Sequence, residues 1–185
     1  MDLEGQKVLP AIHSMKDFER MLESKYTYGV FLDLHISRLR SVFQMANSQN
    51  KKMFLHMDLI QGLKNDEYAT EFICQELKPY GIISTKSSVI KKAKQKGVLA
   101  TQRTFILDSN AFNRSIEQIE KNSPDFIEVL PGVVPKVITR LKEATGTPIF
   151  AGGLIETAEE VENAIHAGAI AVTSSNHDLW KLYDQ

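Results

Sequence analysis

Short apolar segments recur along the chain, and each is followed by a polar or amphipathic segment. Continuous apolar runs of this kind are typical of strands buried on both faces, as in a parallel sheet whose crossovers are helices. Eight strands are predicted on this basis, at residues 8–12, 28–32, 52–57, 81–84, 98–101, 125–130, 148–151 and 169–172.

Several of the segments between these strands have the apolar spacing of an amphipathic helix. Pro135 is placed to begin one helix and Gly146 to end it, because proline fits the first helical turn and glycine the position after the last. Thr157 and Glu160 have the spacing of a capping box at the start of another helix. Helical faces are also predicted within residues 36–46 and 69–77, with weaker helices at 88–95 and 110–121.

Eight alternating units in 185 residues allow about 23 residues per unit, which is close to the least that a strand, a helix and two loops need. Such units close into a (β/α)8 barrel or remain an open, doubly wound sheet. No G-x-G-x-x-G motif follows the first strand, where a dinucleotide-binding sheet would carry it. We therefore predict an α/β fold, a compact TIM-type (β/α)8 barrel, with residues 1–185 as a single domain.

The composition is that of a globular protein, with 22 Lys and Arg against 23 Asp and Glu and a net charge of −1. A neutral chain does not bind nucleic acid through bulk charge, so an RNA or DNA role would need a local patch. The single cysteine, Cys74, is expected in the core. No apolar run is long enough for a membrane span, and no signal peptide is evident at the N-terminus, so a cytoplasmic location is expected.

Polar residues stand at the carboxyl end of nearly every predicted strand, where barrels of this class place their sites. Polar residues appear there in any case as a strand leaves the core, but the set as a whole favours a ligand site. Its members are Ser14, Asp33, His56, Asp58, Lys86, Gln102, Arg103, Glu128, Gly152, Gly153, Thr173, Ser174 and Ser175.

The loops after the seventh and eighth strands have the composition of a phosphate site. Gly152 and Gly153 let backbone N–H groups approach an anion, because no Cβ intrudes. Thr173, Ser174 and Ser175 add hydroxyl donors. Asn176 is placed to cap a short helix over residues 178–183. A tight turn would explain the glycine pair alone, but the pairing of both loops predicts phosphate binding.

Glu128 lies inside an apolar strand, where a carboxylate is costly unless it is paired or faces a wet site. Lys86 is the partner that we expect, and together the two could bind the hydroxyls of a polyol; a lysine there would also suit a Schiff-base aldolase. His56 and Asp58 alternate and could act as acid and base, bind a metal or brace a loop. No third ligand is evident, so no metal site is predicted.

The segment 86–96 carries five lysines and no acid. Its inward positions are apolar, which leaves Lys91, Lys92, Lys94 and Lys96 on the exposed side of a helix. A solvated helix face accounts for such a run, yet in a neutral protein the concentration is also suited to RNA phosphates.

Six strings together resemble the glycerol-3-phosphate-responsive antiterminators, the family of the glycerol uptake operon antiterminator regulatory protein. They are KKMFLHMDLIQGL, YGIISTKSS, GVLATQRTFILDS, DFIEVLPGVVPKVI, TPIFAGGLI and VTSSNHDLW, and the resemblance covers roughly residues 5–185. It implies a bacterial regulator with a barrel fold that binds sn-glycerol 3-phosphate as effector and then the leader mRNA of glycerol-catabolic genes. No cofactor, catalytic residue or membrane contact is expected, and a homodimer is left open.

On this resemblance the phosphate would bind at Gly152, Gly153, Thr173, Ser174 and Ser175. The glycerol moiety would lie near Glu128, with Lys86, His56, Asp58 and Gln102 close by, and the four lysines would bind RNA. Two other classes stay open: a barrel enzyme acting on a small phosphorylated metabolite (an isomerase, an aldolase or a glycerol-phosphate prenyltransferase), and a ligand sensor that acts on a protein partner.

Overall fold

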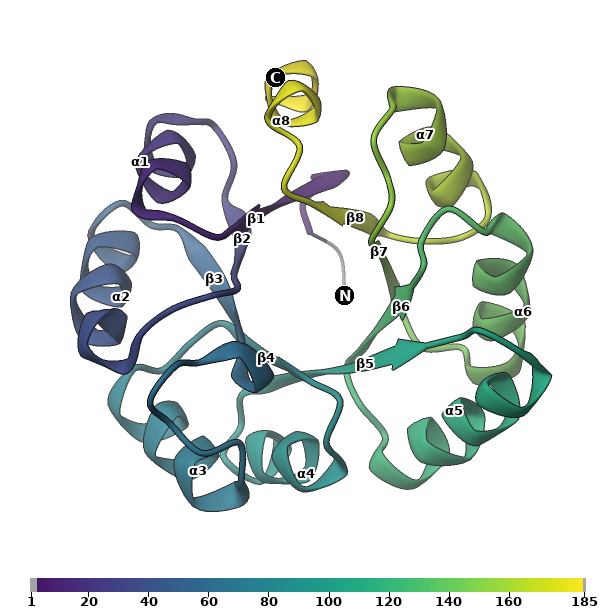
Figure 1. The fold of residues 1–185 in the computed structure, drawn as a ribbon, viewed down its shortest axis with the longest axis horizontal. Coiled ribbons are helices and arrows are strands. Elements are labelled where there is room, and N and C mark those ends of the chain that lie inside the picture. The colour runs from purple at the N-terminus through teal and green to yellow at the C-terminus, as the bar shows by residue number, and fades with distance from the viewer. Residues whose placement is uncertain (1–2, 185) are drawn as a thin grey trace.

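Eight parallel strands close into a barrel in a computed structural model that describes residues 3–184 (Figure 1). Each strand pairs with the next, and β8 returns to pair with β1 through the register Val8↔Val172. The strands are β1 (Val8–Ile12), β2 (Tyr28–Phe31), β3 (Lys52–His56), β4 (Gly81–Ser84), β5 (Leu99–Phe105), β6 (Phe126–Leu130), β7 (Ile149–Gly152) and β8 (Ala171–Ser174).

Helices form a ring around the barrel, one after each strand (Figure 1). They are α1 (Met15–Glu23), α2 (Leu39–Ser48), α3 (Glu67–Glu76), α4 (Ser87–Gln95), α5 (Ser109–Asn122), α6 (Pro135–Thr145), α7 (Ala158–His166) and α8 (His177–Tyr183). Two 3-10 turns, η1 (Ile36–Arg38) and η2 (Met57–Leu59), precede α2 and α3. The predicted barrel is confirmed, and none of the helices in the described part of the chain is both long and apolar enough to cross a membrane.

The helix boundaries follow the predicted signals where those signals are local. Pro135 begins α6, Gly146 ends it with φ 64°, and Thr157 and Glu160 form the expected capping box of α7. The prediction missed α1, although Ser14 and Asp17 form a second capping box at its start. Met15, Phe18 and Leu22 have helical apolar spacing and pack on the core, so the sequence does carry a periodic signal for α1 that the prediction did not use.

Strand β5 is longer than predicted, because it continues past Thr101 to Phe105. Its polar residues resemble a loop in sequence, but in a strand they alternate between two different environments. The side chain of Arg103 points into the barrel, whereas the next residue, Thr104, bonds to Ser115 of α5 on the outside. Strand β8 begins two residues later than predicted, and β3 ends at His56, because Met57 starts η2.

The barrel interior changes character from one end to the other. The rings of Phe54, Phe126 and Phe150 pack with centroids 4.7–6.0 Å apart and fill its middle. Two residues further along the same strands come His56, Glu128 and Gly152. Since side chains alternate along a strand, these three positions form the next interior layer toward the carboxyl ends. An aromatic floor therefore lies beneath a polar layer.

Candidate functional site

A cavity of about 460 Å³ opens at the carboxyl ends of the strands, above the aromatic floor. Its polar wall includes Arg103, Glu128, Thr173, Ser174, Ser175 and Asn176, and its apolar wall includes Val30, Leu32 and Leu130. Gly153 and Leu154 of the β7–α7 loop and His13 of the β1–α1 loop lie at its rim. Its volume suits a small ligand, and its polar groups lie mostly on the β5–β8 side.

Glu128 is the buried charge of this cavity, with 3% of its surface exposed. Thr173 Oγ1 donates a hydrogen bond to Glu128 Oε1 at 2.8 Å, and Arg103 Nη1 lies 3.3 Å from Glu128 Oε2. Burial raises the pKa of Glu128, whereas the Arg103 charge and the Thr173 hydroxyl act to lower it. Arg103 and Glu128 face each other across the β5–β6 pair, so strand register brings the two charges together.

Glu128 is therefore paired with Arg103, and the expected pair with Lys86 is wrong. Lys86 lies exposed before α4, and its Nζ donates to the backbone oxygen of Asn65 at 2.8 Å. No lysine is present among the described residues that line the cavity. Arg103 is among the strand-end residues predicted from the sequence, but only the β5–β6 register shows that it pairs with Glu128.

Gly152 leaves the space that the Glu128–Thr173 hydrogen bond needs. A Cβ at Gly152 would lie 2.6 Å from Thr173 Oγ1 and 3.1 Å from Glu128 Oε1. Gly153, by contrast, lines the cavity with φ +76°, and a Cβ there would lie 3.2 Å from Leu130 Cδ2. The two glycines thus differ in function: Gly152 accommodates the buried cluster and Gly153 shapes the rim.

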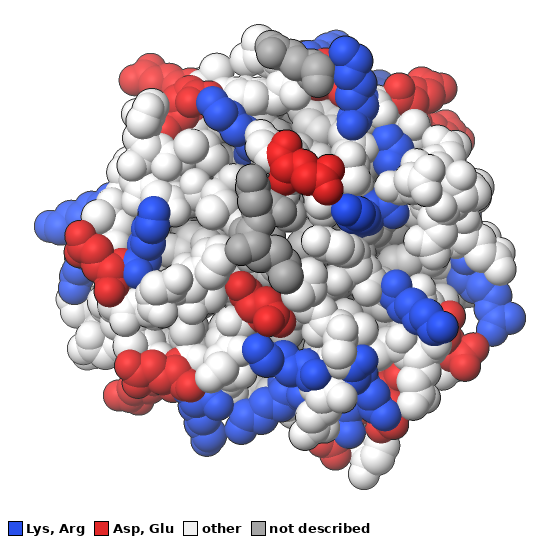
Figure 2. Space-filling view, turned by 180° about the vertical axis from the view of Figure 1, so that it is seen from behind, with Lys and Arg blue, Asp and Glu red and all other residues white. Residues whose placement is uncertain are grey.

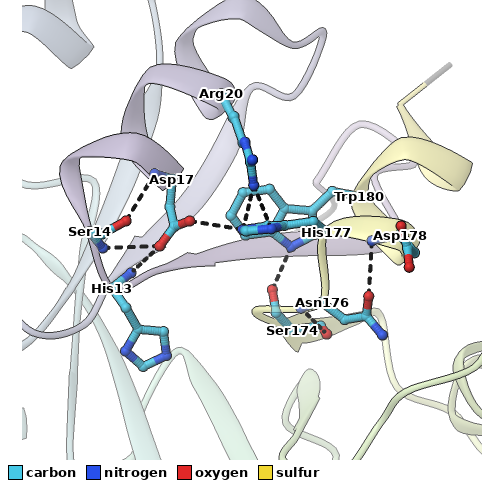
Figure 3. A network of polar contacts seen from close by, with 9 residues as sticks. All are labelled: His13, Ser14, Asp17, Arg20, Ser174, Asn176, His177, Asp178 and Trp180. Carbon is cyan, nitrogen blue, oxygen red and sulfur yellow. Dashed lines mark hydrogen bonds and ion pairs between the residues drawn. The ribbon is translucent and has the colours of Figure 1, made fainter.

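The loop after β8 is tied to the loop after β7. Asn176 caps α8 as predicted, since its Oδ1 accepts from the backbone N–H of Asp178 at 2.9 Å. Its Nδ2 donates to the backbone oxygen of Glu156 at 3.0 Å. Ser174 Oγ accepts from the Asn176 N–H at 3.2 Å, and the Ser174 carbonyl accepts from Trp180 Nε1 at 2.6 Å (Figure 3). These bonds fix the polar wall of the cavity.

A second network joins α1 to α8 beside this wall (Figure 3). Asp17 accepts hydrogen bonds from the backbone N–H groups of His13 and Ser14, at 3.3 and 3.0 Å, and contacts His177 Nε2 at 2.8 Å. Burial acts to raise the pKa of Asp17, but hydrogen bonds from Ser14 and His177 outweigh it and lower that pKa. Arg20 contacts the other ring nitrogen of His177. The sequence analysis did not identify this network.

Asp58, a further residue of the predicted glycerol site, braces the neighbouring loops. Asp58 accepts from Asn65 Nδ2 at 2.7 Å and from Thr85 N and Oγ1 at 2.8 and 2.7 Å, and Ser84 Oγ also donates to it. Burial acts to raise the pKa of Asp58, yet these hydrogen bonds lower it overall. Of the three roles considered for Asp58, the contacts match that of a loop brace.

Gln102 points away from the cavity, toward the helices. Its Oε1 accepts from Asn122 Nδ2 at 2.9 Å, and its Nε2 donates to the backbone oxygen of Thr85 at 3.1 Å. The expectation that Gln102 lies near the cavity came from ending the strand at Thr101. Because β5 continues, Gln102 occupies an outward position of the strand and fastens β5 to α5.

His56 belongs to the polar layer beneath the cavity. Only 2% of its surface is exposed, and neither ring nitrogen has a hydrogen-bond partner. Burial, aided by the charge of Arg103, lowers the pKa of His56 to about 4. The ring is therefore neutral at pH 7, with one donor and one acceptor nitrogen. No group of three or more His, Cys, Asp or Glu side chains within residues 3–184 is arranged to hold a metal ion.

Acidic side chains lie close to the four predicted RNA-binding lysines, three of which are on α4 while Lys96 directly follows it. Lys92 Nζ is 3.4 Å from Glu71 Oε2, and Lys96 pairs with the same carboxylate. Lys94 Nζ is 3.3 Å from Asp125 Oδ1. Lys91 is exposed, and no ion pair of its side chain occurs within the described residues. Figure 2 shows Lys and Arg gathered over the lower edge of the molecule, where α3 and α4 lie, with acidic side chains between them.

The fold and the cavity together define a (β/α)8 barrel with a polar, ligand-sized site at the carboxyl ends of its strands. The chain belongs to the glycerol-3-phosphate responsive antiterminator family, whose model matches residues 8–180. The resemblance noted in the sequence is thereby confirmed.

Two solved structures and one curated protein illustrate the relationship. The crystal structure of a glycerol uptake operon antiterminator regulatory protein from Listeria monocytogenes is 47% identical, with a TM-score of 0.93 and 95% of each chain covered. An antiterminator-related protein from Thermotoga maritima is 32% identical, with a TM-score of 0.84 and coverage of 95% of this chain and 98% of that one. The uncharacterised protein YgcP of Escherichia coli is 32% identical over 180 residues, which are 97% of this chain and 94% of that protein.

Proposed function

We propose that this protein binds sn-glycerol 3-phosphate in the cavity at the carboxyl ends of its strands and, in that state, binds the leader mRNA of glycerol-catabolic genes to prevent premature transcription termination. Family membership supports the effector and the regulatory role. The observation that carries the ligand site is the buried Glu128–Arg103 pair at the base of a cavity whose rim is formed by the β7–α7 and β8–α8 loops.

The phosphate would lie at the rim, which Gly153, Ser174 and Ser175 line, and would accept hydrogen bonds from backbone N–H groups and hydroxyls there. The glycerol carbons would point inward, toward Glu128 and the polar layer that contains His56. Gly152 and Thr173 would act through Glu128, by giving it room and a hydrogen bond. Lys86, Asp58 and Gln102 would support the neighbouring loops without touching the ligand.

The RNA surface would include Lys91, Lys92, Lys94 and Lys96. Three of these lysines already neutralise Glu71 or Asp125, so RNA phosphates would have to compete with those carboxylates. Each protomer would therefore offer few unpaired positive charges to RNA, and a homodimer would present two such surfaces.

The experiment that tests this function is a gel shift of a leader transcript, with and without glycerol 3-phosphate. Binding that tightens with the ligand supports the antiterminator role. By linkage, RNA must then raise ligand affinity by the same factor. Ligand binding without any RNA binding would favour a sensor that acts on a protein partner. Turnover of a phosphorylated metabolite would favour an enzyme, although Schiff-base chemistry would need a lysine in the cavity and Lys86 lies outside it.

A further inference from the structure

The Glu128–Arg103 pair retains hydrogen-bonding capacity that no protein group uses. Thr173 satisfies Glu128 Oε1 at 2.8 Å. Glu128 Oε2 is buried and accepts no hydrogen bond, because Arg103 Nη1 stands 3.3 Å away without the geometry of one. A buried charged oxygen in this state is an exception that calls for a missing partner. Glu128 lines the ligand-sized cavity, so this acceptor lies directly behind the cavity wall.

Part of the unused capacity lies inside the barrel. His56 on β3 and Thr101 on β5 also have buried polar side-chain atoms without partners. Through the registers His56↔Ile83 and Ile83↔Thr101, these two residues flank the same inward residue of β4. Arg103 is two residues beyond Thr101 on β5 and therefore faces the same interior. The layer beneath the cavity is thus built to meet polar atoms, whereas the phenylalanines below it are not.

The chemistry of the pair decides which polar atoms it accepts. An ionised carboxylate only accepts hydrogen bonds, and a guanidinium only donates them. A hydroxyl group placed beside the pair can donate to Glu128 Oε2 and accept from Arg103. A carbonyl oxygen can accept from Arg103 but leaves Glu128 without a donor and places its own negative dipole against the carboxylate.

We infer that the Glu128–Arg103 pair makes the site selective for the alcohol form of its phosphorylated ligand over the corresponding carbonyl form. This inference rests on the proposed function and specifies which ligand the site prefers. Through Glu128, the protein distinguishes the alcohol from the carbonyl form of a three-carbon phosphate. Gly152 contributes because any side chain there would crowd the carboxylate that makes the distinction.

Calorimetric titration of the purified protein with glycerol 3-phosphate and with dihydroxyacetone phosphate tests the inference directly. A lost hydrogen bond to a charged group predicts an affinity for the carbonyl compound that is about 10- to 100-fold weaker. Glu128→Gln should reduce this ratio to within about threefold, because the amide can donate to a carbonyl as well as accept from a hydroxyl. Glu143→Gln, which removes an exposed carboxylate from α6, is the matched control and should keep the ratio.

The outcomes separate this inference from the proposed function. If the wild-type protein binds both compounds with similar affinity, the selectivity is refuted while the ligand site stands. If glycerol 3-phosphate does not bind at all, the proposed function itself fails and the selectivity fails with it. The comparison of the two ligands on the wild-type protein holds even if Glu128→Gln does not fold. A folded Glu128→Gln protein with unchanged selectivity would assign the discrimination to another residue and overturn the role of Glu128.

Discussion

The carboxylate of Asp17 and the imidazole of His177 lie 2.8 Å apart and join the first helix of the barrel to the last. Both residues stand at the beginning of their helices, and Asp17 also accepts from the backbone of the β1–α1 loop. One side chain therefore fixes two of the loops that meet at the cavity.

Asp17→Asn should lower the free energy of unfolding by about 1 kcal/mol at pH 7, since a neutral amide replaces the charge in a helix cap and in the His177 contact. The folded-state pKa of Asp17 is lowered, so its contribution is present above the unfolded-state pKa and is lost as the pH falls through the folded-state value. The difference in the free energy of unfolding between wild type and variant should thus disappear below about pH 4. Urea unfolding across pH 3–7 measures it, with the exposed Asp178→Asn as control. A gap that is constant with pH would refute the role of the charge.

Arg103→Met should destabilise the fold by about 3–5 kcal/mol at neutral pH, because it leaves Glu128 buried without its counter-charge. Burial already raises the pKa of Glu128, and loss of Arg103 removes one of the groups that hold it down. A raised folded-state pKa of an acid means that stability is lost as the pH rises through it. The variant should therefore lose more stability at pH 8 than at pH 5. Adding Glu128→Gln should recover part of the loss, and failure to do so would show that the pair is not coupled.

Gly153→Val should weaken glycerol 3-phosphate binding, because a branched side chain would enter the rim and approach Leu130. The positive φ of Gly153 also adds a strain of about 1–3 kcal/mol. Gly146→Val is a matched control, since Gly146 has φ +64° and no atom within 4 Å of a built Cβ, and it lies outside the cavity. Calorimetric titration should show lost affinity only for Gly153→Val. Equal effects of both substitutions would mean that strain, and not the rim, is responsible.

Replacing Lys91, Lys92, Lys94 and Lys96 by Gln should lower the affinity for leader RNA and reduce the slope of log affinity against log salt by up to about 3. Glu71→Gln should act in the opposite direction, because it releases Lys92 and Lys96 from their shared carboxylate. Gel shifts at several salt concentrations measure both changes, and glycerol 3-phosphate binding should persist in both variants. If neither substitution changes the RNA affinity, the RNA-binding surface lies elsewhere on the protein.

Most of the strands were predictable because they are apolar runs buried on both faces, and this pattern is local in sequence; in β5 only the first residues have it. The helix ends at Pro135, Gly146 and Thr157 were predictable for the same reason. The partner of Glu128 was not predictable, since Lys86 after β4 and Arg103 in β5 are both cations near strand ends. Only the β5–β6 register brings Arg103 opposite Glu128.

One misplaced strand end accounts for the misassignment of Gln102. Ending the fifth strand at Thr101 put Gln102 into a loop at the mouth of the cavity. Because β5 continues to Phe105, its side chains go on alternating, so Gln102 points outward and Arg103 inward. Asp58 was misassigned for the related reason that η2 breaks the alternation after His56. The phosphate and glycerol roles of the remaining residues stay predictions, and the titrations above test them.

The pairing of β1 with β8 has a consequence for biosynthesis. β1 is synthesised well before β8, its partner across the closing seam. At ribosomal speeds of about 5–20 residues per second, β1 waits on the order of 10–30 s with one edge uncovered. The loops that complete the polar wall of the cavity follow β7 and β8, so they too are made after the other strands of the barrel. The cavity is therefore complete only in the closed barrel, and not in a nascent chain that lacks β8.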